Sequence, residues 1–176
     1  MEKLRLITLS TMYNLKTILW EAGWDFVTLL DSAPEDYKYI VLPQNYDPNS
    51  NEIQTPVVVI NLMVGEIVPY EIGGRGRDQL SIHLDIFGSN KGQRDDLLYF
   101  LFDKLTAKAY RLYNETVLEK VDAVPFPPTE HPESIGNIDY GTDNSVDYHR
   151  DLGPDFYGSL VGVYDGFIRM KSVKVY

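Results

Sequence analysis

The sequence predicts an α/β protein of the α+β kind, with a mostly antiparallel β-sheet flanked by two main helices and with long loop or arm extensions. One segment repeats its apolar residues with the period of a helix, and a second has a helix-capping signal followed by an apolar run. A third alternates apolar and polar residues as a half-buried strand does. With 44% hydrophobic residues, a chain of 176 residues can bury one core. We expect an α/β core over residues 1–128, an acidic loop or arm over 129–156, and a C-terminal β-hairpin over 157–176 that returns to the core.

The composition argues against several classes of protein. The formal net charge is −10, so the chain lacks the positive charge that drives binding to phosphate backbones. The absence of cysteine excludes disulfides, thiolate metal sites and cysteine nucleophiles. The longest apolar stretch, Val57–Val64, is much shorter than the roughly 20 residues that span a bilayer, and no apolar signal segment follows the charged N-terminus. We therefore expect a protein that is made in the cytoplasm and does not associate with membranes.

The first helix is predicted over residues 10–22. Its apolar residues recur with helical spacing: Leu15, Ile18, Leu19 and Ala22. Gly23 stands where a left-handed C-terminal cap is favoured. Because Leu4 and Ile7 continue the same stripe, the helix can also begin earlier.

Strands are predicted next along the chain. Residues 26–30 and 39–42 are short extended segments, and the proline- and asparagine-rich stretch 43–56 predicts a long loop. The β-branched run Val57–Ile60 predicts a central strand, and Gly65 interrupts it.

An antiparallel hairpin follows. Residues 66–72 resume the strand, and the glycine-rich segment Gly73–Arg77 predicts a hairpin tip. From Gln79 to Phe87 apolar and polar residues alternate, so one face of this strand should lie on the core. Arg75 and Arg77 in the tip are either solvated charges or contacts to an acidic patch on another protein.

The second helix is predicted from Asn90 to about Leu105. After its polar first turns, Leu97–Phe102 is apolar on every side, and such a helix needs more than one packing surface. We therefore expect the first helix or a neighbouring subunit to cover it, with Tyr99 and Phe102 as candidate contact residues. The 13 tyrosines of the chain are compatible with such an interface.

The last third of the chain predicts less regular structure. Residues 117–124 are a strand candidate, whereas 129–155 is acidic, rich in Pro, Gly and Asn, and predicts an irregular loop or arm. Residues 157–164 and 167–175 predict a hairpin around the dipeptide Asp165-Gly166. Three residues of the acidic segment are candidate contacts to another subunit: Asp143, Asp147 and Tyr148.

No motif predicts catalysis, a cofactor or a metal site. Residues Gly88–Gln93 lie between a strand and a helix, as a phosphate-binding loop would, but lack its glycine spacing and its hydroxyl residue. His83 and Asp85 share a strand face, whereas His131 and His149 lie in distant segments, so the spacing brings no three metal ligands together. No serine stands in a Gly-x-Ser-x-Gly elbow.

One segment resembles a known family. Residues 80–97 read LSIHLDIFGSNKGQRDDL and resemble the strand–turn–helix core of the tail terminator and neck (head–tail joining) proteins of tailed bacteriophages. In those families an alternating strand ends in a short polar turn, and Gly-Gln-Arg/Ala-x-x-Leu then opens the main helix. The preceding helix and β-meander are similar too, so the resemblance covers residues 10–124.

The resemblance implies a non-enzymatic virion protein. Subunits of these families are small α/β proteins that form a ring, typically of six copies, which caps the tail tube and joins it to neck or adaptor proteins. DNA passes through the lumen without specific binding, and an acidic chain suits such a conduit. The long acidic segment from Thr129 onward departs from the family pattern, and as an arm it would contact a neighbouring subunit or another neck protein.

Two other functions stay open from the residues. The first is a small acidic ligand- or carbohydrate-binding β-rich module, in which Trp20 and Trp24 serve as stacking platforms. These tryptophans are one helical turn apart, so core packing or an interface explains them equally well. The second is a metal-dependent hydrolase that uses His83, Asp85 and His149.

Overall fold

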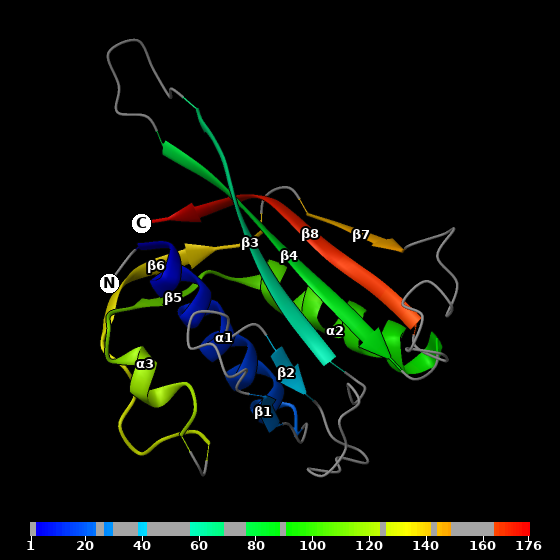
Figure 1. Ribbon diagram of the computed structural model, residues 1–176, viewed down its shortest axis with the longest axis horizontal. Coiled ribbons are helices and arrows are strands. Elements are labelled where there is room, and N and C mark those ends of the chain that lie inside the picture. Colours follow the sequence, from blue (N-terminus) through cyan, green and yellow to red (C-terminus); the bar gives the residue numbers. More distant parts are fainter. Residues whose placement is uncertain are drawn as a thin grey trace.

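The α+β class predicted from the sequence is confirmed by the computed structural model (Figure 1). An eight-stranded antiparallel sheet packs with two long helices and one short one in the part of the chain that the structure describes. That part comprises residues 3–23, 27–29, 39–41, 57–68, 77–88, 91–123, 126–141, 144–148 and 164–176.

The strand order of the sheet differs from the chain order. The helices are α1 (Lys3–Glu21), α2 (Lys91–Ala107) and α3 (Val117–Lys120). The strands are β1 (Val27–Leu29), β2 (Tyr39–Val41), β3 (Val57–Val68), β4 (Arg77–Gly88), β5 (Tyr110–Tyr113), β6 (Ser134–Asp139), β7 (Asn144–Tyr148) and β8 (Tyr164–Val175). The order across the sheet is β1-β2-β3-β4-β8-β6-β5, and β7 also pairs with β8. The last strand of the chain therefore lies at the centre of the sheet, between β4 and β6.

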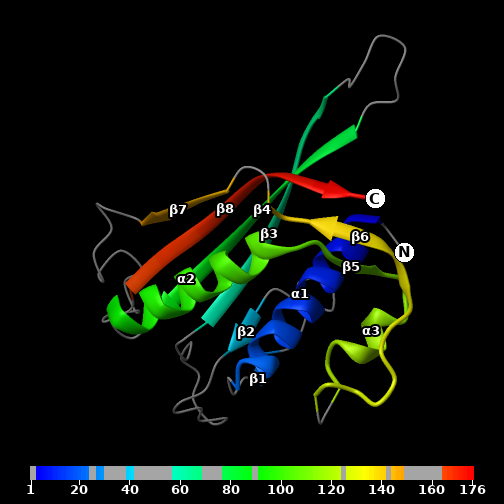
Figure 2. The same cartoon turned by 180° about the vertical axis from the view of Figure 1, so that it is seen from behind.

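The two long helices cover the same face of the central strands. In Figure 2, which views the molecule from behind, α2 lies in front of β4 and β8, and α1 packs against β3 and α2. The apolar residues of β4 are buried in the core: Leu80, Ile82, Leu84 and Ile86. Its alternate residues, among them His83 and Asp85, are half-buried. The alternation predicted for residues 79–87 is therefore confirmed.

The helix that is enclosed on all sides is α1. Every residue from Leu9 to Lys16 is buried, and α1 packs against β5, α3, β3 and α2. It begins at Lys3 rather than near residue 10, because the apolar stripe continues toward the N-terminus. The predicted cap is confirmed, since Gly23 has a φ of 80° and its N–H donates to the Trp20 carbonyl oxygen at 3.0 Å.

The predicted hairpin is formed by β3 and β4. Pairing runs from Val57 opposite Phe87 to Val68 opposite Arg77. Between Val64 and Ile67 the register shifts because β3 holds one more residue there than β4 does. Gly65 lies in this bulge, so it disturbs the pairing instead of ending the strand.

The strand predicted over 117–124 is wrong. The chain forms β5 earlier, at Tyr110–Tyr113, and then the single-turn helix α3. Val117 and Val121 are both fully buried, and the Val121 N–H donates to the Val117 carbonyl oxygen at 2.9 Å. Two buried valines four residues apart lie on one side of a helical turn, and that spacing favours the helix.

The irregular arm predicted over 129–155 is also wrong where the structure describes it. β6 and β7 lie one after the other along the same edge of β8: β7 pairs with Gly166–Met170, and β6 pairs with Lys174 and Val175. The pairing with β8 supplies the backbone hydrogen bonds of these strands despite their acidic, glycine-containing sequence. The boundary expected at residue 129 therefore does not separate an arm from the sheet.

The hairpin predicted around Asp165-Gly166 is wrong as well. Both residues lie inside β8, opposite Phe87 and Ile86 of β4. Gly166 is also opposite Tyr148 of β7. Strands on both sides hold this dipeptide extended, and this tertiary pairing overrides its turn preference.

Candidate interaction surfaces

The turn from β4 into α2 depends on a glycine. A Cβ atom added to Gly88 would stand 2.8 Å from the backbone nitrogen of Arg94 and 3.1 Å from its Cα. Backbone atoms cannot give way as a flexible side-chain end does, so glycine is needed here for α2 to pack back on β4. The strand and the helix expected within residues 80–97 are both present, as β4 and the start of α2.

α2 buries most of its apolar residues within the chain. Its fully buried residues are Leu97, Leu98, Leu101 and Leu105. Phe102 is half-buried against the core, and Tyr99 is 49% exposed. α2 packs against β4, β8, β7 and α1. The sequence predicted that either the first helix or a neighbouring subunit would pack on α2, and the first helix does. One exposed tyrosine does not by itself require a neighbouring subunit.

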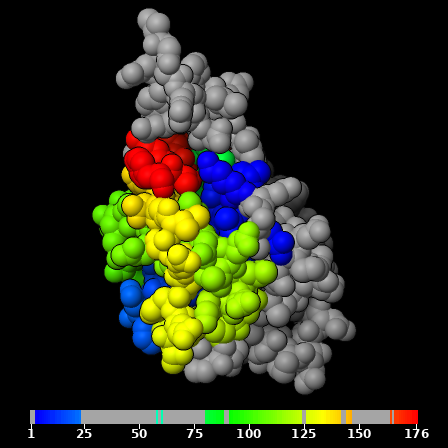
Figure 3. All heavy atoms as spheres, turned by 90° about the vertical axis from the view of Figure 1, so that its left-hand side faces the viewer, coloured from blue at the N-terminus to red at the C-terminus, as the bar shows by residue number. Residues whose placement is uncertain are grey.

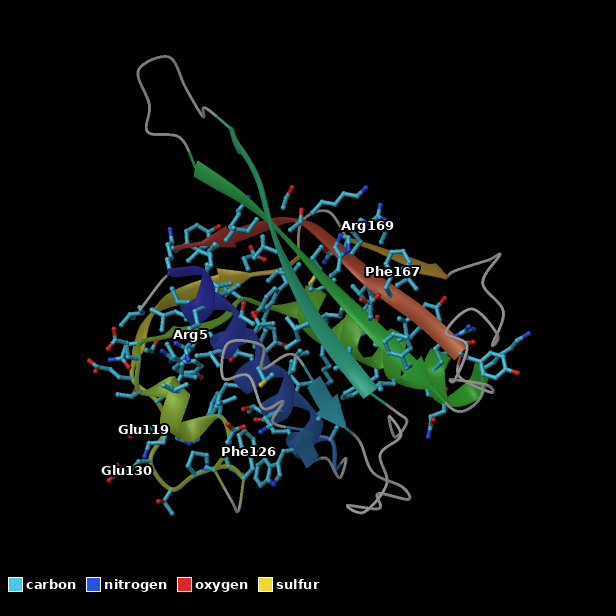
Figure 4. The ribbon with its side chains drawn as sticks, viewed as in Figure 1. Arg5, Glu119, Phe126, Glu130, Phe167 and Arg169 are labelled. Carbon is cyan, nitrogen blue, oxygen red and sulfur yellow. The ribbon has the colours of Figure 1, made fainter. Side chains whose placement is uncertain are left out.

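The sheet face opposite the long helices carries a small aromatic and charged cluster. The rings of His83 and Phe167 stack with centroids 6.2 Å apart, and the Arg169 guanidinium lies 5.4 Å from the same Phe167 ring. Figure 4 shows Phe167 and Arg169 side by side on β8. Burial and the Arg169 charge lower the pKa of His83 below its usual value, against the opposing effect of Asp85. His83 is therefore a neutral ring at pH 7.

The structure does not join the histidines into a metal site. Among the described residues, no group of three His, Asp or Glu side chains could hold a metal ion. The Nδ1 atom of His131 is hydrogen-bonded to the Tyr13 hydroxyl at 2.9 Å, on the side of the sheet that the helices cover. His149, the third residue of the hydrolase hypothesis, lies outside the described residues.

The contact residues predicted from the sequence lie in separate places. Arg77 is the first residue of β4, opposite Val68. Asp147 and Tyr148 lie in β7, opposite Phe167 and Gly166. Tyr99 and Phe102 lie on α2, as described above, and Arg75 and Asp143 are outside the described residues. No single patch unites the residues whose positions are known.

The tryptophan platform of the carbohydrate-binding hypothesis is only partly described. Trp20 is 49% exposed on α1, and Trp24 is outside the described residues. Trp20 does not line the groove that lies between α1 and β5.

A groove of about 530 Å³ lies between α1 and β5, and the sequence did not predict it. α1 contributes its C-terminal half, and the chain from the end of α2 through β5 contributes the other wall. The lining residues are Asn14, Thr17, Ile18, Glu21, Ala22, Lys104, Ala107, Lys108, Ala109, Tyr110, Arg111 and Tyr113. The two walls come from segments that are far apart in the sequence. The clustering of Lys104, Lys108 and Arg111 is the one local pattern that could have indicated a positively charged groove.

The groove is mostly positive. Three cationic side chains and one carboxylate, that of Glu21, line it. The Tyr110 hydroxyl donates to the Lys104 carbonyl oxygen at 2.5 Å, and the Lys108 Nζ lies 5.4 Å from the centre of the Tyr110 ring. Burial, and then the Glu21 charge, raise the pKa of Tyr110, so its hydroxyl is neutral at pH 7.

Buried polar side chains fasten α1 to the segment that follows β5. The Lys16 ammonium donates to the Val121 carbonyl oxygen and lies 3.7 Å from an Asp122 carboxylate oxygen. It also lies 5.4 Å from the centre of the Phe126 ring. Burial lowers the pKa of Lys16 to about 8 and raises that of Asp122, each against the attraction of the other. The lost hydration therefore outweighs the attraction of the pair.

Comparisons with known proteins identify no relative. No protein-family model, no curated protein and no solved structure matches the chain. Within the described residues, the structure contains no helix with the length and apolarity needed to cross a membrane.

Proposed function

We propose that this chain is a non-enzymatic structural subunit of a tailed-bacteriophage virion. It is a tail terminator or a related connector, and it forms a ring, of six copies, that caps the tail tube and joins it to neck proteins. The sequence of residues 80–97 supports this class, because it resembles the core motif of those families. The packing of α2 on β4 around Gly88 is the geometry expected from that motif.

The observation that carries the assembly part of the proposal is the β3–β4 ribbon. In Figure 1 the far ends of β3 and β4 extend beyond the other strands of the sheet. β4 pairs with β8 only from Leu80 onward, so Ile67 and Val68 pair with Asp78 and Arg77 outside the wider sheet. An isolated two-stranded ribbon is only marginally stable in water. A contact with a neighbouring subunit would stabilise this one.

The outer edge of β3 supports the same proposal. β2 pairs only with Val57–Val59. Among the described residues, Ile60–Val68 therefore has a paired strand on the β4 side alone. Unpaired N–H and C=O groups along such an edge favour the addition of a strand from another chain.

The net charge fits a ring through which DNA passes. Six copies would together carry six times the charge of −10. Negative side chains on the lumen repel the DNA backbone, so DNA slides without sticking. Salt screens this repulsion beyond about 8 Å, so only residues at the lumen contribute to it.

Light scattering of the purified chain, coupled to size exclusion, tests the proposal. We expect a discrete assembly of several 20.2 kDa copies, formed alone or on addition of tail tube protein. Electron microscopy of the assembly should show closed rings. A chain that stays monomeric at high concentration, with and without tube protein, would contradict the proposal.

A further inference from the structure

The α1–β5 groove concentrates positive charge in an acidic protein. Lys104, Lys108 and Arg111 line it, and none of the three forms an ion pair with a carboxylate in the described part of the chain. The chain as a whole carries a net charge of −10, so three neighbouring cations are a local exception. Cations gathered in one groove repel one another, and an anion placed among them relieves that repulsion.

The size and walls of the groove suit one or two acidic side chains. Its volume of about 530 Å³ lies within the range of small-ligand pockets. Apolar residues of both walls, among them Ile18 and Ala107, could pack against the stem of an inserted side chain. The amide of Asn14 is already used, because its Nδ2 donates to the Arg111 carbonyl oxygen at 3.0 Å. The lysine and arginine side chains are the remaining donors.

The molecule carries a complementary surface at another place. Four exposed glutamates gather around α3 and the segment before β6, and we name them the acidic corner: Glu115, Glu119, Glu130 and Glu133. Glu130 has 86% of its side chain accessible, and it pairs loosely with Lys120 at 3.7 Å. Figure 4 shows Glu119 and Glu130 at the same end of the molecule, directed away from the core.

The groove and the acidic corner lie at different places: the groove is between α1, the end of α2 and β5, and the corner is on α3 and the segment before β6. The elements that line the groove, α1 and the end of α2, face the viewer in Figure 2. The chain around α3 and residues 126–133 faces the viewer in Figure 3. A contact between two different surfaces of identical copies is head-to-tail: it leaves one groove and one corner free, and copies add until a ring closes.

We propose that the groove of one copy receives the acidic corner of a second copy, with Lys104, Lys108 and Arg111 binding the carboxylates of Glu119 and Glu130. This inference rests on the proposed function, because it names the contact by which the ring forms. It adds a head-to-tail electrostatic contact to the strand edge of β3 and the ribbon.

Charge reversal tests the contact. The groove variant is Lys104→Glu/Lys108→Glu, and the corner variant is Glu119→Lys/Glu130→Lys. All four side chains are exposed, as are those of Lys91 and Lys171. We expect each variant alone to associate at least tenfold more weakly than the unaltered chain, measured by sedimentation. An equal mixture should regain assembly, because the reversed groove of one variant then meets the reversed corner of the other.

Controls separate this contact from general charge effects and from misfolding. Lys91→Glu/Lys171→Glu changes the net charge as much as the groove variant does, at exposed lysines outside both surfaces, and should leave association unchanged. Melting temperatures of all variants confirm folding. If the unaltered chain assembles and both reversed variants assemble equally well, the groove contact is refuted and the proposed function stands. If the unaltered chain remains monomeric at high concentration, with and without tail tube protein, both are refuted.

Disulfide trapping gives a second test, since the chain has no cysteine of its own. Lys108→Cys and Glu119→Cys are made in separate chains, mixed and oxidised. We expect a cross-linked dimer that contains one chain of each kind. The same yield from a mixture of Lys91→Cys and Glu119→Cys would overturn the assignment.

Discussion

Lys16 shows at the scale of one residue how α1 is held. Its ammonium is enclosed among Val121, Asp122 and Phe126, and its pKa falls to about 8 because burial removes its hydration. A lysine that remains charged at pH 7 in such a place costs stability and fixes one position of the helix. That cost depends on pH.

We expect the free energy of unfolding to rise between pH 8 and pH 10. The pKa of Lys16 is about 8 in the folded chain and near 10.5 when unfolded, so between these values the unfolded state binds the extra proton and stability increases with pH. Above pH 10 the trend reverses, because burial raises the pKa of Tyr13 and Tyr140 to about 12 and only the unfolded tyrosines ionise there. Urea unfolding at a series of pH values measures this, and Lys16→Met should remove the rise. An equal rise in that variant would contradict the assignment.

Gly88 makes a second prediction at the residue scale. Gly88→Ala should lower the free energy of unfolding by about 1–3 kcal/mol, because its Cβ would meet the backbone of Arg94. Gly92→Ala, at an exposed position in the first turn of α2, is the matched control and should be neutral or slightly stabilising. Equal losses of stability in urea unfolding for both variants would show that the turn has room for a side chain.

At the scale of elements, the two helices exchange the roles expected of them. α2 has the more continuous apolar sequence, yet its outer face is exposed. α1 is instead buried all round from Leu9 to Lys16, including its polar residues Ser10, Thr11 and Asn14. Each of these polar residues has a partner in the chain: Ser10 accepts from the Tyr113 N–H, Thr11 meets the Tyr140 hydroxyl, and Asn14 donates to Arg111. Satisfied hydrogen bonds make burial of a polar helix face tolerable.

A pair of substitutions on α2 checks this assignment of faces. Leu98 is fully buried, so Leu98→Ala should cost about 2–5 kcal/mol of stability. Tyr99 is half exposed, and Tyr99→Ala should change stability by no more than about 0.5–1 kcal/mol. Thermal unfolding of the two variants measures the difference, and comparable losses would mean that the outer face of α2 is covered.

The candidate contact residues Arg75 and Arg77 give a prediction for assembly. Arg75→Glu/Arg77→Glu should impair assembly and leave the melting temperature within about a degree or two, because Arg77 lies in the part of β4 that is outside the wider sheet. Lys171→Glu on the exposed side of β8 is the control. An unchanged yield of assembled particles would remove the arginines from the interface.

The sequence predictions succeeded where local patterns decide the structure and failed where contacts between distant segments decide it. β4 and the start of α2 were predictable because alternation and a glycine-ended turn are local patterns. The prediction of a hairpin at Asp165-Gly166 failed because β4 pairs with both residues and β7 pairs with Gly166, and these pairings hold the dipeptide extended. The groove joins residues 14–22 to 104–113 and has no local pattern, so only the folded chain could show it.

At the scale of the whole molecule, charge is unevenly distributed. Acidic residues dominate the chain and gather at the acidic corner, whereas three cations share one groove. If the head-to-tail contact forms, salt should weaken assembly, because the screening length falls from about 10 Å at 0.1 M to about 3 Å at 1 M. Sedimentation across this range measures the effect. Assembly that strengthens with salt would instead indicate an apolar interface.

The open margin of β3 also has a practical consequence for producing the protein. A strand of mostly apolar sequence that, among the described residues, is paired on one side only can template stacks of further copies, in the manner of insoluble fibrils. We therefore expect poor recovery when the gene is expressed alone at high level, and a better yield when a binding partner is synthesised alongside it.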